Sequence, residues 1–248
     1  MTAPVLILDE TDSTNAEARR RAEAGEVGPL WITARRQTAG RGRRGRQWGS
    51  DSGNLFTSLL LLTQKSPAEA AQLTFAASLA VADLLDRYVP PALVTIKWPN
   101  DVLLDGRKTS GILIESGPAP SGGLWLAVGI GVNLSQTPGE TERPATCIAE
   151  HLAHDVVAAP SVDEAAKALA ETFGAWLDRW TTLGFQPILD AWIARTPGLH
   201  GPCTARLTNE TLIGTADGVE ADGSLRLKLP DGRLRVISAG DVFFGEAA

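Results

Sequence analysis

The sequence contains few of the residues from which disulfide frameworks, metal sites and histidine-based catalytic centres are made. Among 248 residues there are 2 cysteines and 3 histidines. Cys147 and Cys203 form neither a metal-type pair nor a disulfide framework, which is typical of a protein in a reducing compartment. No histidine lies near the motifs described below, and no Ser-His-Asp or Cys-His pattern is present. Catalysis by a histidine-activated nucleophile is therefore not expected.

Targeting segments and long apolar runs are also missing. The first ten residues carry no basic region and only a short apolar stretch, so we expect no signal peptide. The most apolar long segment, residues 68–85, is interrupted by Glu69, Gln72 and Asp83, and we interpret it as a buried helix and not a membrane span. A net charge of −6 argues against a general polyanion binder. We predict a globular cytoplasmic protein without a membrane partner.

The hydrophobic periodicity predicts an α+β fold in which a mixed β-sheet is flanked by helices. Strands are expected at residues 5–8, 30–34, 55–62, 94–96, 102–104, 111–115 and 124–132. Helices are expected at residues 14–24, 68–85, 161–182 and 187–194. The first three helices begin at capping-box patterns, which are Thr14 to Glu17, Ser66 to Glu69 and Ser161 to Glu164.

The character of the chain changes after Pro197-Gly198. Short alternating strands follow between residues 203 and 244, and Asp222-Gly223 and Asp231-Gly232 are strong hairpin signals. We therefore predict a larger domain over residues 1–198 and a small β-barrel over residues 199–248.

Residues 37–54 are rich in glycine and arginine and have no helical periodicity, so they are expected to form a long functional loop. Six arginines fall within twelve residues without one acidic residue among them: Arg35, Arg36, Arg41, Arg43, Arg44 and Arg46. Such a charge density favours an anionic partner, and the interleaved glycines let the backbone approach it. A solvated charge run or a nucleic-acid patch has the same composition.

Two familiar phosphate-binding motifs fail in this loop. Gly40 to Gly45 matches the G-x-G-x-x-G string, but the residues that follow do not open a helix. In a Walker A loop, Arg46-Gln47 would stand where lysine and a hydroxyl residue are required.

Four other segments carry polar groups in suggestive places, although each has a simpler interpretation. Lys97 ends an apolar strand and precedes a turn, but a surface lysine would look the same. Gly111 interrupts a strand entered by Arg107-Lys108, as either a bulge or a ligand seat. Gly129 to Asn133 is a glycine-bearing strand that ends in an amide, and Ser13 to Asn15 is explained by a helix cap.

The combination and order of these segments resemble the biotin–protein ligase family over essentially the whole chain. The matching motifs are Ser13 to Asn15, Gln37 to Trp48, Lys97 to Asp101, Arg107-Lys108 with Gly111 to Leu113, and Gly129 to Asn133. The resemblance implies a catalytic biotin- and ATP-binding domain followed by an SH3-like domain. It implies activation of biotin with ATP as biotinyl-5′-AMP, then transfer of biotin to a lysine of a biotin carboxyl carrier protein.

The resemblance also implies roles for individual residues. The catalytic residues would be Lys97, Arg43 and Arg46. The biotin-binding residues would be Ser13, Thr14, Asn15, Gln37, Arg41, Gly42, Arg43, Lys97 and Gly111, with Gly111 leaving room for the biotin rings. The ATP-binding residues would be Arg43, Arg46, Trp48, Lys108 and Asn133, with Trp48 against the adenine. Mg²⁺ is expected as the counter-ion of ATP, and no dedicated ligand set is assigned.

The first motif begins at Ser13, which leaves no room for the N-terminal helix-turn-helix of repressor members of the family. We expect a ligase-only form that does not recognise specific DNA sequences, as a monomer or a homodimer. Two alternatives remain, a lipoate–protein ligase and a non-enzymatic nucleic-acid-binding module. The net charge of −6 and the single tyrosine disfavour the second alternative.

Overall fold

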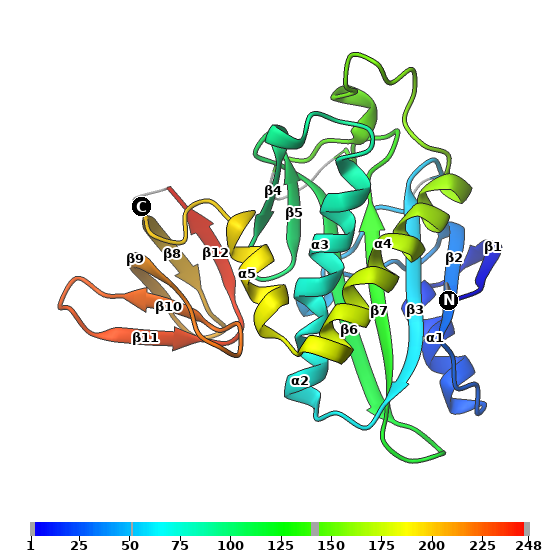
Figure 1. The fold of residues 1–248 in the computed structure, drawn as a ribbon, viewed down its shortest axis with the longest axis horizontal. Coiled ribbons are helices and arrows are strands. Elements are labelled where there is room, and N and C mark those ends of the chain that lie inside the picture. The colour runs from blue at the N-terminus through cyan, green and yellow to red at the C-terminus, as the bar shows by residue number, and fades with distance from the viewer. Residues whose placement is uncertain (1–2, 51, 140–143, 246–248) are drawn as a thin grey trace.

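The computed structural model describes residues 3–50, 52–139 and 144–245. A seven-stranded sheet carries helices on both faces, and a five-stranded sheet lies beside it (Figure 1). The strands of the large sheet are β1 (Val5–Thr11), β2 (Leu30–Gln37), β3 (Leu55–Thr63), β4 (Val94–Lys97), β5 (Asp101–Leu104), β6 (Arg107–Pro118) and β7 (Leu124–Val132). The helices are α1 (Thr14–Glu23), α2 (Pro67–Ala71), α3 (Leu73–Leu85), α4 (Val162–Leu183) and α5 (Gln186–Ala194). Short 3-10 helices lie at Arg43–Gly45, Pro91–Leu93 and Ile148–Glu150.

The large sheet has the strand order β1-β2-β3-β7-β6-β5-β4. β1 pairs with β2 in parallel, and the other neighbouring pairs are antiparallel. The predicted α+β class with a mixed sheet is therefore confirmed, and each strand predicted for this sheet is present.

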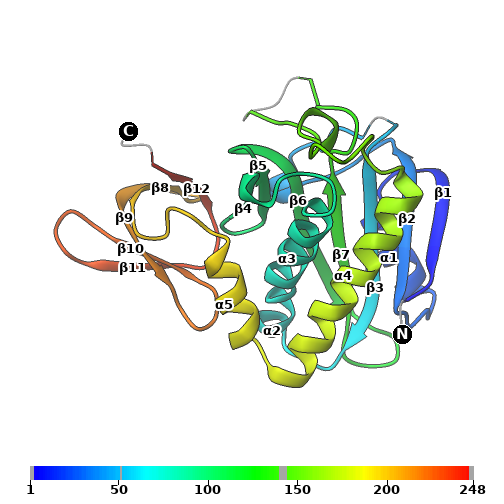
Figure 2. The same ribbon diagram turned by 45° about the horizontal axis from the view of Figure 1, so that its top comes forward.

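Different helices cover the two faces of the large sheet. α3 and α4 lie on one face and α1 on the other (Figures 1 and 2). Because successive side chains of a strand point to opposite faces, Leu59 and Val128 join the core cluster of α3, whereas Leu60 and Ala127 join Ala18 of α1. The α1 face is left open beyond the N-terminus of α1, and the site described below lies there.

The apolar segment predicted to be a buried helix is confirmed as a core element. Residues Pro67–Leu85 are long and apolar enough to cross a membrane by length and composition, but 67% of the most apolar window is buried inside the protein. Leu79, Leu84 and Leu85 are almost fully buried. These residues stabilise the fold by removing apolar surface from water.

The smaller sheet consists of β8 (Pro202–Arg206), β9 (Thr211–Val219), β10 (Leu225–Lys228), β11 (Leu234–Ile237) and β12 (Asp241–Phe244) in the order β11-β10-β9-β8-β12. Gly223 and Gly232 have φ of 90° and 86°, as their hairpin turns require. The predicted small all-β domain is therefore confirmed. Among the described residues β11 and β12 lie at opposite edges of this sheet, and no strand pairing closes it. β12 is directed to the larger domain, where the Lys97 ammonium lies 5.7 Å from the centre of the Phe243 ring.

One hydrophobic cluster joins the two sheets. Leu225 and Leu227 of β10 belong to the same cluster as the residues of α3. The Trp98 indole donates a hydrogen bond to the Gly223 carbonyl at 2.9 Å. A Cβ atom at Gly223 would lie 2.5 Å from the ring of Phe75, so the hairpin turn packs directly on this helix. The small sheet is therefore anchored next to the end of β4.

Two of the three predicted capping boxes are confirmed. Ser66 and Ser161 each accept a hydrogen bond from a backbone N–H three residues later, and the glutamate there accepts one in return. The box predicted at Thr14 is wrong, because the N-cap is Ser13 and its side chain makes no capping hydrogen bond. Thr14 instead donates its backbone N–H to the Gln37 side chain at 2.8 Å.

This difference between the caps has a measurable effect on stability. Ser161→Ala should lower the free energy of unfolding by about 1 kcal/mol, because it removes a formed N-cap hydrogen bond. Ser13→Ala should change it by less than about 0.5 kcal/mol, because no such bond is lost. Urea unfolding of both variants measures the difference, and equal losses would contradict the assignment of the caps.

Candidate active site

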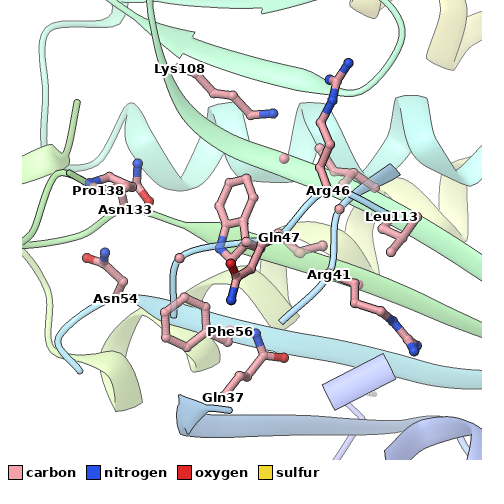
Figure 3. A pocket seen from close by; sticks show the side chains of 18 of the residues that line it. Gln37, Arg41, Arg46, Gln47, Asn54, Phe56, Lys108, Leu113, Asn133 and Pro138 are labelled. Atoms are coloured by element: carbon pink, nitrogen blue, oxygen red, sulfur yellow. The ribbon is translucent and has the colours of Figure 1, made fainter. Parts of the chain in front are cut away.

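A cavity of about 540 Å³ opens on the α1 face of the large sheet (Figure 3). Gln37 and Lys108 lie at opposite ends of the view, with Asn54 and Asn133 on one side and Arg41 on the other. The cavity brings together nearly all residues singled out in the sequence: Ser13, Thr14, Asn15, Gln37, Arg41, Gly42, Arg43, Arg46, Trp48, Lys108, Gly111 and Asn133. Lys97 does not line it.

Glycines of β6 and β7 form the floor of the cavity. A Cβ atom at Gly129 would lie 2.3 Å from the amide oxygen of Asn15, and one at Gly131 would lie 2.6 Å from the Trp48 indole. A Cβ atom at Gly111 would lie 2.9 Å from the same indole. Trp48 therefore packs over Gly111, and the expectation that this glycine leaves room for the biotin rings stays a prediction.

One end of the cavity is lined mainly by uncharged polar side chains. The Thr14 hydroxyl donates to the Gln37 side-chain oxygen at 3.2 Å, and the Gln37 amide nitrogen donates to Ser50 at 3.0 Å. The buried Ser58 hydroxyl lies 2.7 Å from the Thr14 hydroxyl and 2.6 Å from the Asn15 amide oxygen. These contacts fix side chains from α1, β2 and β3 in one hydrogen-bonded wall.

Two buried polar atoms at the opposite side have no hydrogen-bond partner within the described residues. They are the Asn133 side-chain oxygen and the Trp48 indole nitrogen. The Asn133 amide nitrogen donates to the Thr146 carbonyl at 2.9 Å, which leaves the oxygen available as an acceptor. A buried polar atom without a partner is costly, so this side of the cavity is suited to a ligand with hydrogen-bonding groups.

Asn54 organises the same side and was not singled out in the sequence. Its side-chain oxygen accepts the backbone N–H groups of Leu134, Ser135 and Gln136 at 2.9, 3.2 and 3.1 Å. Its amide nitrogen donates to the Gln136 carbonyl at 2.8 Å. The chain that leaves β7 towards the cavity rim is therefore held by one side chain. In the sequence, the position of Asn54 at the end of the loop is the one indication of this role.

Arg43 is a partly buried cation of the cavity. Burial lowers the pKa of its guanidinium from the ordinary value, although arginine stays charged at any physiological pH. Arg43 donates to the Asn100 side-chain oxygen at 2.9 Å and to the Gly240 carbonyl at 3.3 Å. Within the described chain it makes no hydrogen bond to a carboxylate, which suits it to an incoming anion.

Asp101 lies between the two lysines of the site. Its side-chain oxygens lie 2.6 Å from the Lys108 ammonium and 3.7 Å from the Lys97 ammonium. Asp101 lines the cavity, whereas Lys97 does not. The Lys97 ammonium is thus next to a cavity-lining carboxylate without itself lining the cavity.

Two of the six clustered arginines belong to a strand and not to the basic loop. Arg35 and Arg36 belong to β2, where they pair with Asp163 and Glu10. The remaining arginines follow, and the Gly42 backbone N–H closes the loop on the Arg46 carbonyl at 2.8 Å. The loop begins later than its arginines suggested because β2 pairs with β1 as far as Gln37.

The loop is attached to the small sheet through Asp241. Arg44 and Arg46 lie 3.2 and 2.5 Å from the same Asp241 oxygen. Asp241 also lines the cavity. No local pattern reveals this carboxylate, because it follows the loop by nearly two hundred residues.

Comparison with known proteins is consistent with this geometry. Residues 8–135 match the biotin/lipoate A/B protein ligase family, and residues 202–245 match the biotin protein ligase C terminal domain. Over 245 residues the chain is 44% identical to a biotin–[acetyl-CoA-carboxylase] ligase of Paracoccus denitrificans, covering 96% of this chain and 100% of that protein. The chain belongs to the biotin protein ligase family. The resemblance found in the sequence is thereby confirmed.

Other members of the biotin protein ligase family match over nearly the whole chain. A bifunctional ligase/repressor BirA of Bacillus subtilis is 32% identical, with 95% of this chain and 72% of that protein covered. The structure of a biotin protein ligase from Aquifex aeolicus in complex with biotin and ATP superposes with a TM-score of 0.81. It covers 98% of this chain and 99% of the Aquifex chain at 24% identity, which establishes the shared fold.

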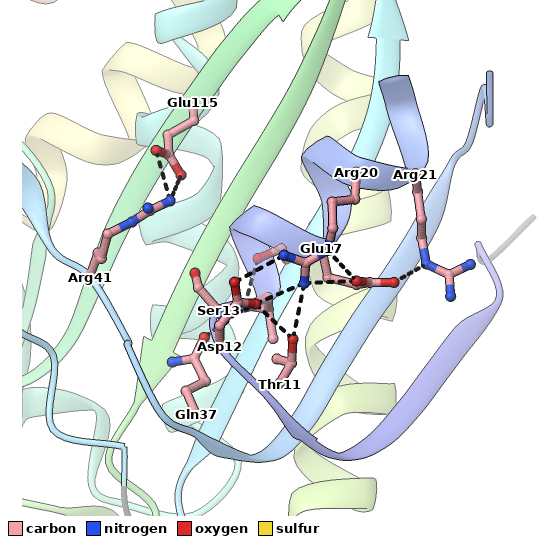
Figure 4. Close-up of polar contacts among 11 residues, drawn as sticks. Thr11, Asp12, Ser13, Glu17, Arg20, Arg21, Gln37, Arg41 and Glu115 are labelled. Atoms are coloured by element: carbon pink, nitrogen blue, oxygen red, sulfur yellow. Dashed lines mark hydrogen bonds and ion pairs between the residues drawn. The ribbon is translucent and has the colours of Figure 1, made fainter. Parts of the chain in front are cut away.

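A charged network in this family member holds the turn that leads into Ser13 (Figure 4). Asp12 accepts the Ser13 backbone N–H at 2.7 Å, and Arg20 of α1 donates to its two oxygens at 2.9 and 2.8 Å. Hydrogen bonds from Arg20 hold the pKa of the Asp12 carboxyl well below its ordinary range. Neither residue was singled out in the sequence.

The depressed pKa of Asp12 predicts a pH-dependent contribution to stability. The ionised carboxylate stabilises the fold above its unfolded pKa of about 4, and this contribution is lost as the pH falls through the lower folded pKa. Because Asp12 and Arg20 are half exposed, it should amount to less than about 1 kcal/mol. Asp12→Asn should therefore be destabilising at pH 7 and nearly neutral at the lowest pH at which the protein folds. Urea unfolding at several pH values tests this, and a pH-independent difference would contradict it.

Proposed function

We propose that the protein joins biotin to ATP as biotinyl-5′-AMP and transfers the biotinyl group to a lysine of a biotin carboxyl carrier protein. The observation that carries the proposal is the division of one cavity into an end lined mainly by uncharged polar side chains and a cationic end. A neutral ureido ring suits the first end, and carboxylate and phosphates suit the second. The names of the relatives agree with this chemistry.

The first step brings two anions together. A biotin carboxylate oxygen attacks the α-phosphorus of ATP, a carbon–oxygen–phosphorus anhydride link forms, and pyrophosphate leaves. The substrate supplies the nucleophile, so the protein has to position both reactants and stabilise the charge that develops on the phosphoryl group. We assign that role to Arg43, Arg46 and Lys97, with Lys108 in support. Phosphate oxygens would replace Asp241 as the partner of Arg46.

The second step consumes the anhydride. The carrier lysine nitrogen attacks the acyl carbon, the amide bond forms, the acyl–phosphate bond breaks and AMP leaves. The attacking amine has an ordinary pKa of about 10.4 and must first lose a proton. Asp101, which holds both lysines of the site, is the carboxylate that we assign to orienting Lys97 or the incoming amine.

Individual residues divide between the two ends. Ser13, Thr14, Asn15 and Gln37 would hold the ureido ring, with the backbone of Arg41 and Gly42 beside it. Trp48 would stack on the adenine. The Asn133 oxygen without a partner would accept a hydrogen bond from the nucleotide.

Mg²⁺ enters this proposal as part of the MgATP substrate. Within the described residues no group of three histidine, cysteine, aspartate or glutamate side chains is placed to hold a metal ion. The cavity carboxylates Asp101 and Asp241 are already paired with cationic side chains. The ATP phosphates are therefore expected to supply the main ligands of Mg²⁺.

The two buried free cysteines support the proposed cytoplasmic location.

The overall activity has a direct test. Incubation with biotin, MgATP and a biotin carboxyl carrier domain should add one biotinyl group to the carrier, measured by mass spectrometry of the intact carrier. Lipoate with a lipoyl domain serves as the competing reaction. Modification with lipoate but not with biotin would reject the proposal in favour of a lipoate–protein ligase.

Removal of the assigned cations should slow the first step. Arg43→Ala and Lys97→Ala should each reduce the rate of adenylate formation by roughly 10²–10³, the usual effect of losing one contact to transition-state charge. Release of pyrophosphate with biotin and MgATP gives the rate, and thermal unfolding checks that the variants fold. Wild-type rates in folded variants would refute these assignments.

Ligands should also protect the basic loop from proteolysis. The side chains of Arg41, Arg44 and Arg46 are 49%, 35% and 45% exposed, so weak ion pairs hold the loop in the free protein. Biotin with a non-hydrolysable ATP analogue should slow tryptic cleavage after these arginines. Cleavage after Arg233, which is 76% exposed on the hairpin that follows β10, provides the internal control. Equal cleavage of the loop with and without ligands would show that it does not close over them.

A further inference from the structure

Glu115 near the end of β6 contacts two segments that flank the polar end of the cavity. Its carboxylate accepts a hydrogen bond from the Asn15 amide nitrogen at 2.7 Å. Its two oxygens also lie 3.3 and 3.5 Å from one Arg41 nitrogen (Figure 4). One carboxylate thus links the beginning of α1 to the beginning of the basic loop.

The position of Glu115 follows from the register of the sheet. Glu115 lies opposite Ala127, and Leu113 lies opposite Gly129, so both face the α1 side of the sheet. Glu115 does not line the main cavity. It lines a neighbouring hollow, which shares Asn15 and Arg41 with the main cavity. Any effect of Glu115 on a ligand in the main cavity must therefore pass through these two residues.

The contact with Asn15 fixes the orientation of a buried amide. The Asn15 nitrogen donates to Glu115 and to the Leu113 carbonyl at 3.2 Å, and both of these groups can only accept. The Asn15 oxygen must then face the Ser58 hydroxyl at 2.6 Å. Ser58 in turn contacts Thr14 at 2.7 Å. A shift of Asn15 is therefore transmitted to the wall that faces the ligand.

The contact with Arg41 holds the basic loop at the same end. The backbone of Arg41 forms an isolated antiparallel bridge with Gln47, which lies on the other side of the loop. The position of Arg41 therefore affects the backbone on both sides of the loop. The other side of the loop is attached to Asp241 through Arg44 and Arg46. The loop thus has one carboxylate anchor at the polar end of the cavity and another at the cationic end.

We propose that Glu115 is a positioning residue for the biotin end of the site, acting through Asn15 and Arg41 and not by contact with the substrate. This inference rests on the proposed function. Glu115 should therefore affect the affinity for biotin, whereas the affinity for ATP depends on residues at the opposite end of the cavity. The Arg41–Glu115 ion pair is 49% and 36% exposed, so it should contribute little to the stability of the fold.

The test measures the KM for biotin and for ATP in Glu115→Gln, Arg41→Gln and the double variant. Glu115→Gln keeps an acceptor for Asn15 but removes the charge that holds Arg41. Each single variant should raise the KM for biotin about tenfold while the KM for ATP changes less than about twofold. Because the two residues act through one contact, the double variant should resemble the single ones, which is the signature of coupling in a double-mutant cycle.

Glu171→Gln is the matched control. Glu171 of α4 forms an exposed ion pair with Arg87 at 3.4 Å. Neither residue lines the cavity, and α4 covers the face of the large sheet opposite α1 (Figure 1). Glu171→Gln should leave both KM values unchanged. Arg41→Gln, which changes an exposed loop residue, keeps the test open should Glu115→Gln fail to fold.

The outcomes separate the inference from the function. Equal rises of both KM values, additive effects in the double variant, or unchanged KM values would each overturn the positioning role while the wild-type protein still biotinylates its carrier. A wild-type protein that forms no biotinyl-5′-AMP would instead overturn the proposed function itself.

Discussion

Several cationic side chains meet around one cavity in a protein with a net charge of −6, and carboxylates from distant elements hold them there. Glu115 of β6 contacts Arg41, Asp101 at the start of β5 contacts Lys108, and Asp241 at the start of β12 contacts Arg46. Like charges this close repel one another unless they are compensated. The carboxylates that compensate the loop arginines belong to the large sheet and the small sheet, so the loop is attached to both.

The pairing of these cations with carboxylates also indicates how the cavity would accept anionic substrates. Asp101 and Asp241, which pair with cations in the free protein, would exchange for carboxylate and phosphate oxygens in the complex, whereas Glu115 would keep its contact with Arg41. Arg43 differs, because its hydrogen bonds go to neutral oxygens. Its partly buried guanidinium should gain from an incoming anion, which supports the role that we assign to it in the first step.

Small residues of the sheet define the other half of the site. Gly129 and Gly131 of β7 let Asn15 and Trp48 lie directly on the strands. The polar wall around Thr14 and Gln37 is uncharged, in contrast to the loop that closes the cavity. This separation lets one cavity select two chemically different substrates.

Much of the fold could be predicted from the sequence because its signals are local. Strand alternation, the capping boxes at Ser66 and Ser161, and the hairpin glycines depend on residues close together in the chain. The predictions that failed depend on tertiary contacts. Thr14 resembles an N-cap but donates its backbone N–H to Gln37, and β2 continues past its predicted end because it pairs with β1 as far as Gln37.

The candidate site divides in the same way. Its motifs were recognisable as short strings, and the structure gathers nearly all of them around one cavity. The residues that were missed, Asn54, Glu115 and Asp241, act on partners roughly seventy to two hundred positions away, where no spacing rule applies. The sequence likewise does not show that Asp101 and Lys108 line the cavity while Lys97 does not, because this depends on how the three side chains pack.

The most direct test of the central claim is a single-turnover reaction without any carrier protein. The protein is mixed with excess biotin and a limiting amount of ATP labelled at the α-phosphate, and the acid-quenched products are separated. The account predicts that the label appears as biotinyl-5′-AMP, retained by the protein, and only when biotin is present. Label that appears only as AMP, or at the same rate without biotin, would contradict the claim that one cavity joins the two substrates.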